Sequence, residues 1–571
     1  MILMGIQWSA VNTQAAAKTV KIAITKADIK KQGFDNAMQK ALNTAKEKAT
    51  EKKPYVITVP AGKYQMKRTL LVYSNTKIVL EDVTLLAGKG KTVFHIGSLD
   101  ASNKGATGYC YKNISIEGGT LDGKNHSGTV LKVGHAQNFK MTNVTLRNTK
   151  NAHLMETGGV KGLTIKNCRF ENQVSTSKKL NYYEALQLDI LVPWHLLNYR
   201  AETLNTTDVL IDQCEFSNTP RGVGSHTAIL NQPMRNITIT NCTFRDMGSV
   251  AIQGLNWQDV TIENNQIEDS PRGIACYFAT EQGNGTYLPS VIAKEGKTKT
   301  KLSDRYQAPE ANMNVLIQDN TIITNDKKDP YASYERVALL AGSINMEQKC
   351  SRNSDHSGGL PVGDYYYSGI RILNNTIQTA GHGIRFMDIK NAEIAGNKIT
   401  AKPTNEKTGY HGIQIMINCG DISVKDNTIQ NAVTNGLFVN RGSNVTALTN
   451  NTITGSGKYG IGLENATVGL IAENVITNTK EKGIFVFSHS NAEQIKSNTI
   501  ETVLSAEGRG IHVCDSSAAG TVAGNIITAP GAYGIIASSA STIDVLENNQ
   551  VTGATAKNIH ASRDSAIKSG Y

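Results

Sequence analysis

A short phrase that recurs along the chain constrains the fold more than any other feature of the sequence. The phrase is an apolar residue, any two residues, Asn or Cys, any one residue, and Ile, Val, Leu or Phe. It reads IKNCRF at Ile165 and LENNQV at Leu546. Its marker Asn or Cys falls at Cys168, Cys214, Cys242, Asn265, Asn320, Asn375, Asn397, Asn427, Asn451, Asn474, Asn498, Asn525 and Asn549. Repetition at intervals of about 20–50 residues is typical of solenoids and propellers.

A second phrase follows each marker by about ten residues and reads as a β-strand. It is a small residue followed by alternating apolar positions, as in HGIRFMDI at His382 and RGIHVC at Arg509. Such strands cannot bury an apolar face alone, but they can when they stack in parallel register at about 4.8 Å per coil. We expect the marker Asn to tolerate left-handed backbone geometry at the bend and to hydrogen-bond the neighbouring coil.

Together with weaker copies before Cys168, the repeat predicts an all-β parallel β-helix solenoid of about 16 coils. Leucine-rich repeats would show LxxLxL with a helix-length segment, which is absent, and propeller blades need about 40 residues. One helix is predicted, over Asp35–Lys52, where it would cap the open N-terminal end of the solenoid. Cys168, Cys214 and Cys242 share one inward position and predict a stacked core ladder rather than a metal site.

The capping helix, the segments TVPAGKY and TLLVYSNTKIVL, and the Asn-marked coils together resemble the pectate lyase-like right-handed parallel β-helix proteins. The resemblance extends from about residue 30 to the C-terminus. It implies a right-handed helix and a polysaccharide hydrolase, lyase or epimerase such as a polygalacturonase. The polygalacturonase motifs are incomplete: no DD pair follows Glu184, and the GHG at Gly381 to Gly383 lies several coils too far along.

Charge and the two ends of the sequence bear on where the chain works. Lys and Arg exceed Asp and Glu by 11, which favours an anionic partner such as an acidic glycan. Met1 to Val11 is apolar and is followed by small residues, so residues 1–17 are predicted to be a signal-peptide remnant before a single domain, residues 18–571. We therefore expect a secreted, extracellular or surface-associated protein without a membrane span and without a nucleic-acid partner.

Three predicted loop insertions interrupt the repeat, at about residues 173–207, 278–313 and 325–368. Loops this long in a regular solenoid are usually functional or disordered, and their aromatic content argues against disorder. Trp194 and Trp257, the only tryptophans after the predicted remnant, lie in this stretch. Sugar rings stack on such side chains, so the insertions favour a glycan groove.

Strands of the second phrase near these insertions carry most of the candidate site. EALQLD, RGVGSH and VAIQGL align by their small and apolar residues, and alternation then turns Gln187 and Asp189 outward. The candidate catalytic residues are Glu156, Asp189, Glu184 and His226. The candidate substrate-binding residues are His153, Gln187, Arg221, Gln253, Trp257, Arg272, Tyr277 and Trp194. No metal ligand set is predicted.

Carboxylate general acid/base chemistry is the reaction that this patch suggests. Glycoside cleavage needs one carboxyl to protonate the leaving oxygen and a second to act as base or nucleophile. Glu184 and Asp189 would lie roughly 17 Å apart on one extended strand, so the preferred pair is Glu156 with Asp189 across neighbouring coils. Glu184 is the reserve.

Three functions remain open from the sequence. The first is a secreted glycoside hydrolase acting on an oligo- or polysaccharide without a cofactor. The second is a lyase or epimerase acting on uronic acids, with Arg221 and Arg272 binding the carboxylate and Ca²⁺ expected as cofactor. The third is a non-catalytic glycan-binding rod. The mass of the product separates the first two, and the absence of any product indicates the third.

Overall fold

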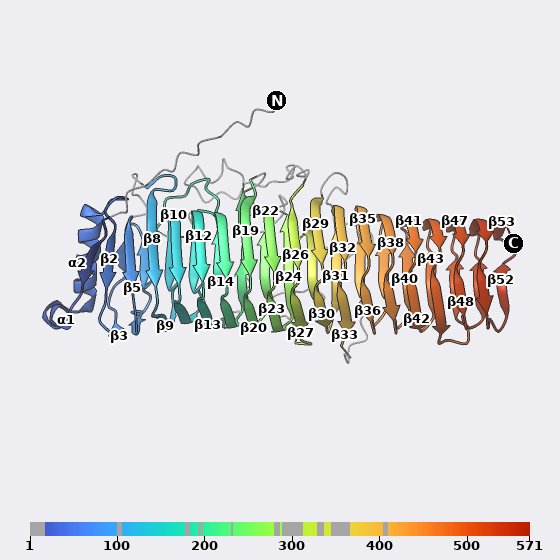
Figure 1. Ribbon diagram of the computed structural model, residues 1–571, viewed down its shortest axis with the longest axis horizontal. Coiled ribbons are helices and arrows are strands. Elements are labelled where there is room, and N and C mark those ends of the chain that lie inside the picture. Colours follow the sequence, from blue (N-terminus) through green and yellow to red (C-terminus); the bar gives the residue numbers. More distant parts are fainter. Residues whose placement is uncertain are drawn as a thin grey trace, which may run out of the picture.

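The structure is a computed structural model that describes residues 18–99, 106–176, 183–191, 196, 198–229, 232–278, 286–287, 312–327, 336–343, 366–402 and 409–570. The predicted remnant at residues 1–17 lies outside these ranges. The described chain forms an elongated rod of stacked strands, with the helices at one end and the C-terminus at the other (Figure 1). Neighbouring strands pair in parallel along the rod, so the predicted parallel β-helix is confirmed.

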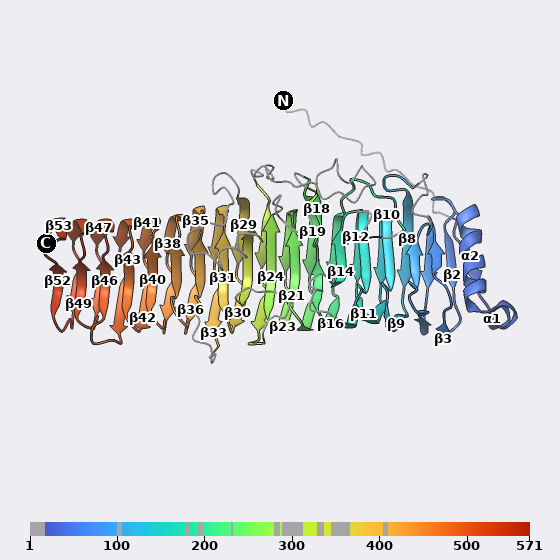
Figure 2. The same cartoon turned by 180° about the vertical axis from the view of Figure 1, so that it is seen from behind.

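Each coil contributes one strand to each of three sheets that run the length of the rod (Figure 2). The order within a coil is third sheet, first sheet, second sheet, as in β20, β21 and β22. The second-phrase strands form the first sheet. The marker residue stands at the bend between the second and third sheets.

The first sheet comprises β4 (Leu70–Val72), β7 (Phe94–Ile96), the first parts of β10 (Leu131–Thr142) and β12 (Met155–Lys166), β14 (Glu184–Asp189), β17 (Arg221–Gly224), β21 (Val250–Leu255), β24 (Arg272–Phe278), β28 (Val337–Ser343), β31 (His382–Met387), β34 (Ile413–Met416), β37 (Leu437–Asn440), β40 (Tyr459–Glu464), β43 (Lys482–Phe487), β46 (Arg509–Val513), β49 (Tyr533–Ala537) and β52 (Lys557–Ala561). Two of these strands, β14 and β28, lie within residues predicted as insertions.

The second sheet comprises β1 (Val20–Ala23), β2 (Tyr55–Thr58), β5 (Thr76–Val79), β8 (Tyr111–Glu117), the second parts of β10 and β12, β15 (Thr207–Asp212), β19 (Met234–Thr240), β22 (Trp257–Glu263), β26 (Val315–Gln318), β29 (Tyr367–Leu373), β32 (Ile389–Ala395), β35 (Gly420–Lys425), β38 (Asn444–Thr449), β41 (Thr467–Ala472), β44 (Asn491–Lys496), β47 (Ala518–Ala523), β50 (Thr542–Glu547) and β53 (Ala566–Ser569).

The third sheet comprises β3 (Gly62–Gln65), β6 (Val83–Leu86), β9 (Thr120–Ser127), β11 (Thr145–Lys150), β13 (Arg169–Val174), β16 (Glu215–Thr219), β20 (Thr243–Met247), β23 (Gln266–Ser270), β27 (Thr321–Thr324), β30 (Thr376–Thr379), β33 (Lys398–Ala401), β36 (Thr428–Gln430), β39 (Thr452–Thr454), β42 (Val475–Thr479), β45 (Thr499–Val503), β48 (Ile526–Thr528) and β51 (Gln550–Thr552). Outside the three sheets, β18 (Ala228–Ile229) pairs with β25 (Thr286–Tyr287).

The marker Asn residues form a hydrogen-bonded ladder inside the bend. Each backbone N–H and each side-chain amide N–H donates to the Oδ1 of the next marker, as from Asn451 to Asn474 at 3.0 Å. The predicted bond to the neighbouring coil is therefore confirmed. The left-handed residue, however, is the one before the marker, such as Asn450 with φ of 52°. This arrangement lets the preceding residue turn the chain while the marker side chain stays inward.

The three marker cysteines continue the ladder toward the N-terminus. Cys168, Cys214 and Cys242 are at most 2% exposed, and the Cys214 N–H points at Cys242 Sγ at 3.4 Å. The Cys242 N–H then donates to Asn265 Oδ1 at 2.9 Å. The predicted stacked core ladder is thus confirmed.

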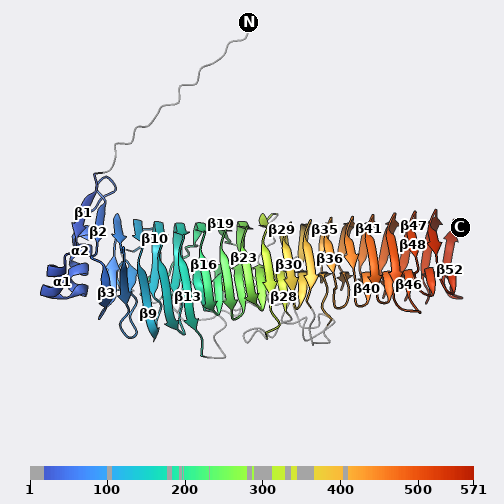
Figure 3. The ribbon, with the colours of Figure 1, turned by 60° about the horizontal axis from the view of Figure 1, so that its bottom comes forward.

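Two helices, rather than the predicted one, close the N-terminal end of the rod (Figure 3). Helix α1 (Lys26–Gln32) begins with a capping box between Thr25 and Asp28. Helix α2 (Phe34–Lys48) ends four residues before the predicted Lys52, because the chain must become extended ahead of Pro54 to enter β2.

Helix α2 covers the end of the core and also satisfies backbone groups of the first coil. Met38, Leu42 and Ala45 are fully buried against the core. The Gln39 side chain donates to the Leu71 carbonyl at 3.2 Å and accepts from the Leu71 N–H at 2.9 Å. These bonds replace the missing neighbour of an end strand. Neither described helix is long and apolar enough to cross a membrane.

Candidate active site

The candidate site is formed by outward residues of β14 and β17, together with His153 just before β12 and His226 just after β17. A break in alternation places Glu184 and Arg221 among these outward residues. Strict alternation from the inward Leu186 would turn Glu184 inward as well. At the bend, however, the small residue just before the inward position also faces the core, so two successive residues point inward. A Cβ added at Gly222 would lie 2.6 Å from Cδ1 of Phe244. Glu184 pairs in register with Arg221, and both side chains therefore remain on the outer face.

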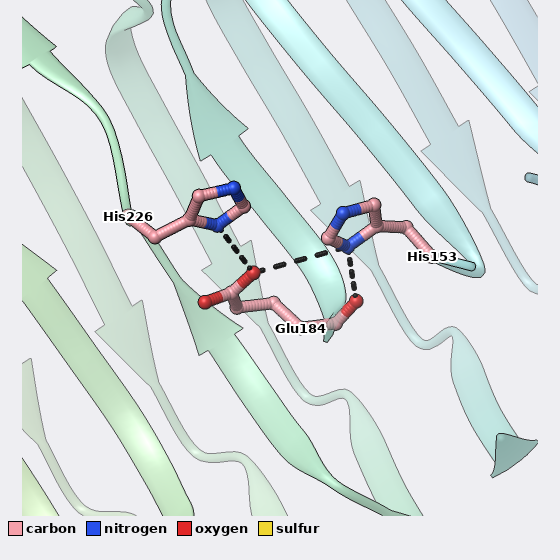
Figure 4. A group of neighbouring side chains, drawn as sticks. All are labelled: His153, Glu184 and His226. Atoms are coloured by element: carbon pink, nitrogen blue, oxygen red, sulfur yellow. Dashed lines mark hydrogen bonds and ion pairs between the residues drawn. The ribbon is translucent and has the colours of Figure 1, made fainter. Parts of the chain in front are cut away.

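Glu184 is the centre of the site, and three cationic or imidazole side chains surround its carboxylate; two of them, His153 and His226, are drawn in Figure 4. Arg221 donates through one guanidinium nitrogen to Oε1 at 3.1 Å. His226 Nδ1 lies 3.0 Å from Oε2, and His153 Nδ1 lies 3.8 Å from the same oxygen. Glu184 itself is 0% exposed. A carboxylate buried this completely requires such compensation.

The two imidazoles face each other as a stacked pair, with ring centroids 5.9 Å apart and planes inclined by 13°. His153 Nδ1 lies 2.8 Å from the Glu184 carbonyl oxygen, which can only accept, so this nitrogen carries the proton. A neutral His153 then has its lone pair on Nε2, which points away from Glu184 in Figure 4. The edge of Tyr183 packs on the His153 ring.

His226 also brings Asp189 into the site. Its Nε2 lies 3.8 Å from Asp189 Oδ2, and the Gln187 amide contacts both Asp189 and His226. An imidazole is about 2 Å across between its nitrogens, so the Glu184 and Asp189 oxygens that flank it are at most about 9 Å apart. The prediction that Glu184 and Asp189 lie too far apart, at roughly 17 Å, was wrong. These residues stand at the two ends of β14, but both side chains point toward the imidazole of His226, which belongs to the next coil.

The environment separates the protonation states of the two carboxyl groups. Burial raises the pKa of Asp189 to about 8, with His226 opposing and Glu184 adding to the shift. Burial acts in the same direction on Glu184, but the combined influence of His226, Arg221 and His153 lowers its pKa to about 2. At neutral pH, Glu184 is therefore ionised and Asp189 holds a proton.

The same environment separates the two histidines. Burial lowers the pKa of His153 below its ordinary value, although Glu156 and Glu184 oppose the change. Burial acts likewise on His226, but the charges of Glu184 and Asp189 reverse it and raise the pKa. Groups of opposite protonation state in one cluster are the usual sign of an acid and a base. We call His153, Glu184, Asp189, Arg221 and His226 the acid–base cluster.

Glu156, the predicted partner of Asp189, has different contacts. It pairs in register with Gln187, whereas Asp189 pairs with Gly158. Its Oε2 accepts from Thr129 at 3.2 Å and lies 3.4 Å from Lys132 Nζ. These partners come from the preceding coil, so Glu156 flanks the acid–base cluster rather than forming its carboxyl pair.

The remaining predicted binding residues divide into outer-face and core positions. Gln253 donates to the Ser225 carbonyl at 3.3 Å, one coil beyond the cluster. Arg272 donates to the Tyr277 hydroxyl at 3.1 Å, and both side chains are buried on the same face. Trp257 is 1% exposed and belongs to the core, which contradicts a sugar-stacking role. Trp194 lies outside the described residues.

Trp257 still contributes to the site indirectly. Its indole N–H donates to Ser225 Oγ at 2.8 Å, and Ser225 in turn donates to the Leu188 carbonyl at 2.5 Å. This chain of bonds holds the segment that leads to His226.

The sequence analysis did not identify Ser225, Tyr183 or Lys132 as residues of the site. The NYYE run ahead of β14 signals Tyr183, and extending the outward row one coil back would have found Lys132.

A metal ion would have to replace existing hydrogen bonds at this cluster. The ligand atoms of His153, Glu184 and His226 lie within 4.8 Å of one another, which is close enough to share an ion. The Nδ1 proton of His153 is already bonded to a carbonyl, and Arg221 lies on the same carboxylate. The residues therefore fit a proton-transfer cluster better than a metal centre.

Two sequence-family profiles match the chain. The profile described as "Right handed beta helix region" matches residues 109–284 and 198–328, which include the acid–base cluster and its neighbouring coils. This is a right-handed parallel β-helix protein. A second profile, "Periplasmic copper-binding protein (NosD)", matches residues 362–527. Neither profile covers half of the chain, so the assignment stops at the fold.

The β-helix protein also resembles one curated relative, the plasmin and fibronectin-binding protein A of Streptococcus pneumoniae (strain ATCC BAA-255 / R6). The two are 24% identical over 409 residues, which is 65% of this chain and 52% of the relative. The β-helix protein thus spans about half the length of that relative.

Solved structures with a similar course of the chain include three β-helix proteins. PfbA, a surface adhesin of S. pneumoniae, shows a TM-score of 0.42 at 16% identity, over 79% of this chain and 88% of its own. The tailspike protein of E. coli bacteriophage HK620 shows 0.42 at 13%, over 92% and 76%. The family 28 exopolygalacturonase of Yersinia enterocolitica shows 0.40 at 10%, over 72% and 79%.

Proposed function

We propose that this protein is a carbohydrate-active enzyme that cleaves a glycan by hydrolysis at the acid–base cluster. The observation that carries the proposal is the pair of carboxyl groups of opposite protonation state, Glu184 and Asp189, on either side of His226. Glycoside hydrolysis needs one group that donates a proton and one that accepts a proton, and environments that push the pKa values of neighbouring groups apart provide such a pair.

Exposure decides which groups touch the substrate. Glu184 and Asp189 are 0% exposed, whereas His226 is 9% and His153 is 6% exposed. We therefore assign contact with the reacting atoms to the two imidazoles. Asp189 replenishes the proton on His226, and Glu184 stabilises the imidazolium as a positioning residue.

The proposed reaction balances with one water molecule. The bond between the anomeric carbon and the leaving oxygen breaks, and the leaving oxygen takes a proton from His226. Water bonds to the anomeric carbon and gives its proton to the Nε2 lone pair of His153. After the cut, His226 has regained its proton from Asp189, so Asp189 is ionised and His153 carries the proton taken from water. Transfer of that proton through solvent from His153 to Asp189 restores the starting state, and Glu184 and Arg221 keep their charges throughout.

Elimination from a uronic acid is the alternative reaction at the same residues. It is favoured by one observation, the shared contact of the His153 imidazole and the Arg221 guanidinium with the Glu184 carboxylate, because elimination needs a base and a cation for the sugar carboxylate. Hydrolysis and elimination at these residues differ in whether water is added to the product.

A binding function is the second candidate. The curated relative is named for binding plasmin and fibronectin, and this chain resembles it over 409 residues. A surface protein that binds a host glycoprotein would use the outer face of the rod without any chemistry. In that case, the protonation states of the acid–base cluster would have no effect on binding.

The test is incubation of the full chain with neutral and acidic polysaccharides, with products analysed by mass. A gain of one water per cut supports hydrolysis, whereas cleavage without added water supports elimination and overturns the proposal. The variants are Asp189→Asn and Glu184→Gln, and the matched controls are Asp421→Asn and Glu493→Gln, which change exposed carboxylates elsewhere. Equal cleavage by all four variants would overturn the assignment of the reaction to the acid–base cluster, and no product from any polysaccharide would leave the binding function.

A further inference from the structure

The C-terminal coils carry a second cluster of functional side chains, far from the acid–base cluster. Two outward rows of the first sheet run along β40, β43, β46 and β49. One row places Tyr459, Lys482, Arg509 and Tyr533 side by side. The other places Phe485 and His512 side by side. We call these six residues the C-terminal stripe.

Contacts within the C-terminal stripe hold aromatic rings and cations together. Lys482 Nζ lies 4.2 Å from the ring centroid of Phe485 and 4.8 Å from that of Tyr459. The Phe485 and His512 rings stack at 5.0 Å, and the Arg509 guanidinium lies 6.0 Å from the Tyr533 ring. Tyr459 meets Phe485 in a T-shaped contact with ring centroids 4.8 Å apart, so the aromatic rings form one continuous group.

Positive charge accumulates in the C-terminal stripe. Burial lowers the pKa of Lys482, and the charge of Arg509 adds to this although Glu481 opposes it. Burial also lowers the pKa of His512 to about 3, and Arg509 and Lys482 both contribute. The carboxylate nearest Lys482 is Glu481 Oε2 at 3.6 Å, on a side chain that is 38% exposed. An anion at this surface would relieve the repulsion.

Two polar atoms of the C-terminal stripe lack a hydrogen-bond partner. Among residues 409–570, all of which the structure describes, Arg509 Nε and His512 Nδ1 are buried and have no hydrogen-bond partner. His512 is 7% exposed, and its other nitrogen is occupied by Ser538 Oγ at 2.8 Å. Buried polar atoms without partners are costly and require an explanation.

We propose that the C-terminal stripe is a binding surface for a carboxylate-bearing polysaccharide. A sugar carboxylate is attracted by the Arg509 and Lys482 cations, which are side by side in the outward row, and the stripe runs along the rod as a linear polyanion would lie. The strands here already pair on both sides, so a peptide would find no free backbone groups, whereas a glycan is recognised by side chains alone.

The C-terminal stripe and the acid–base cluster are separate sites. Nine strand pairings separate β14 from β43, which places them about 43 Å apart along the rod. Binding at the stripe does not depend on catalysis at the cluster. It can therefore be measured in the full chain carrying Asp189→Asn, which slows turnover about 10²–10⁴-fold if the proposed hydrolysis is correct.

The first experiment is calorimetric titration of that chain with polygalacturonate, carboxymethyl-dextran, uncharged dextran and poly-glutamate. Both carboxylated glycans should bind, dextran should not, and poly-glutamate should bind more weakly. Arg509→Gln and Lys482→Gln should each weaken polygalacturonate binding about tenfold. The control Lys496→Gln changes the same charge on the second sheet and should leave the affinity within about twofold.

The second experiment does not depend on a variant folding correctly. Histidine-labelled wild-type protein is titrated by NMR with and without polygalacturonate. A bound carboxylate should raise the pKa of His512 from about 3. Any of three results would overturn the proposal: an unchanged pKa of His512, an equal affinity of Arg509→Gln and Lys496→Gln for polygalacturonate, or equal binding of poly-glutamate and polygalacturonate.

Discussion

The acid–base cluster and the C-terminal stripe occupy the same face of the same sheet but have different chemistry. Around β14, two carboxyl groups and two imidazoles share protons across three coils. Around β43, two neighbouring cations are flanked by aromatic rings, and the carboxylate next to Lys482 is the partly exposed Glu481. The inward rows beneath them are alike, with Leu186 and Val223 in one region and Ile461 and Ile484 in the other.

This difference shows that the solenoid separates stability from function. Inward residues and the Asn ladder maintain the coil, so outward residues can vary without disturbing it. The acid–base cluster is an exception, because its buried Glu184 is both a functional and a structural group. Four predictions test that contrast, beginning with the largest expected effect.

Glu184→Gln should have the largest effect, because it leaves Arg221 and His226 without their buried counter-charge. We expect glycan cleavage to be abolished and the free energy of unfolding at pH 7 to fall by about 3–5 kcal/mol. The folded pKa of Glu184, about 2, lies below the unfolded value of about 4.3, so its contribution is present above pH 4.3 and is lost as pH falls toward 2. Chemical denaturation between pH 2 and 7 measures this, and retained acid dependence in the variant would contradict it.

Asp189→Asn should separate activity from stability. Cleavage should fall about 10²–10⁴-fold, because the amide supplies no proton. The folded pKa of Asp189, about 8, exceeds the unfolded value of about 3.9, so its favourable contribution is complete below pH 3.9 and is lost as pH rises through 8. The variant should therefore unfold at a higher temperature than the wild type at pH 8.

The pH profile of cleavage provides the control for this variant. Wild-type activity should fall on the alkaline side as Asp189 and His226 lose protons. It should fall on the acid side as His153 gains one below its ordinary pKa. Asp189→Asn should shift the alkaline limb only. A variant that lost activity with an unshifted profile would have a purely structural defect.

Asn451→Ala tests the scaffold that the two regions share. It removes an amide that joins three coils, through bonds to Asn427, Val424 and Asn474. We expect the free energy of unfolding, measured by calorimetry, to fall by about 1–3 kcal/mol, with no change in glycan cleavage or in glycan affinity. Asn549→Ala is the matched control, since water can replace the bonds of this half-buried last marker. Equal losses at both positions would contradict an interior ladder.

Glu481→Gln should have the smallest effect on stability and should act only on the C-terminal stripe. Its ion pair with Lys482 is partly exposed, so the free energy of unfolding should change by less than about 0.5 kcal/mol. Polygalacturonate affinity should rise about twofold, because Lys482 no longer has a competing carboxylate. An unchanged or weaker affinity would indicate that Lys482 does not contact the glycan.

The repeat itself could be predicted from the sequence because it is encoded locally. Each marker, such as Asn451, sits at one inward position, and each second-phrase strand, such as the one at Arg509, alternates in polarity. Parallel stacking is the arrangement that buries all these faces at once. The outward positions of Gln187 and Asp189 followed from the same alternation.

The convergence of side chains across coils was decided by the tertiary structure alone. On an extended strand, Glu184 and Asp189 are too far apart to contact each other. Both carboxyl groups nevertheless contact the His226 imidazole, because His226 lies beyond the end of β17. Trp257 is an aromatic residue of the kind that stacks on sugar rings, but the bend before β22 turns its side chain into the core. Periodicity determines which face a residue occupies, whereas bends and side-chain directions, set by packing between coils, determine which residues meet.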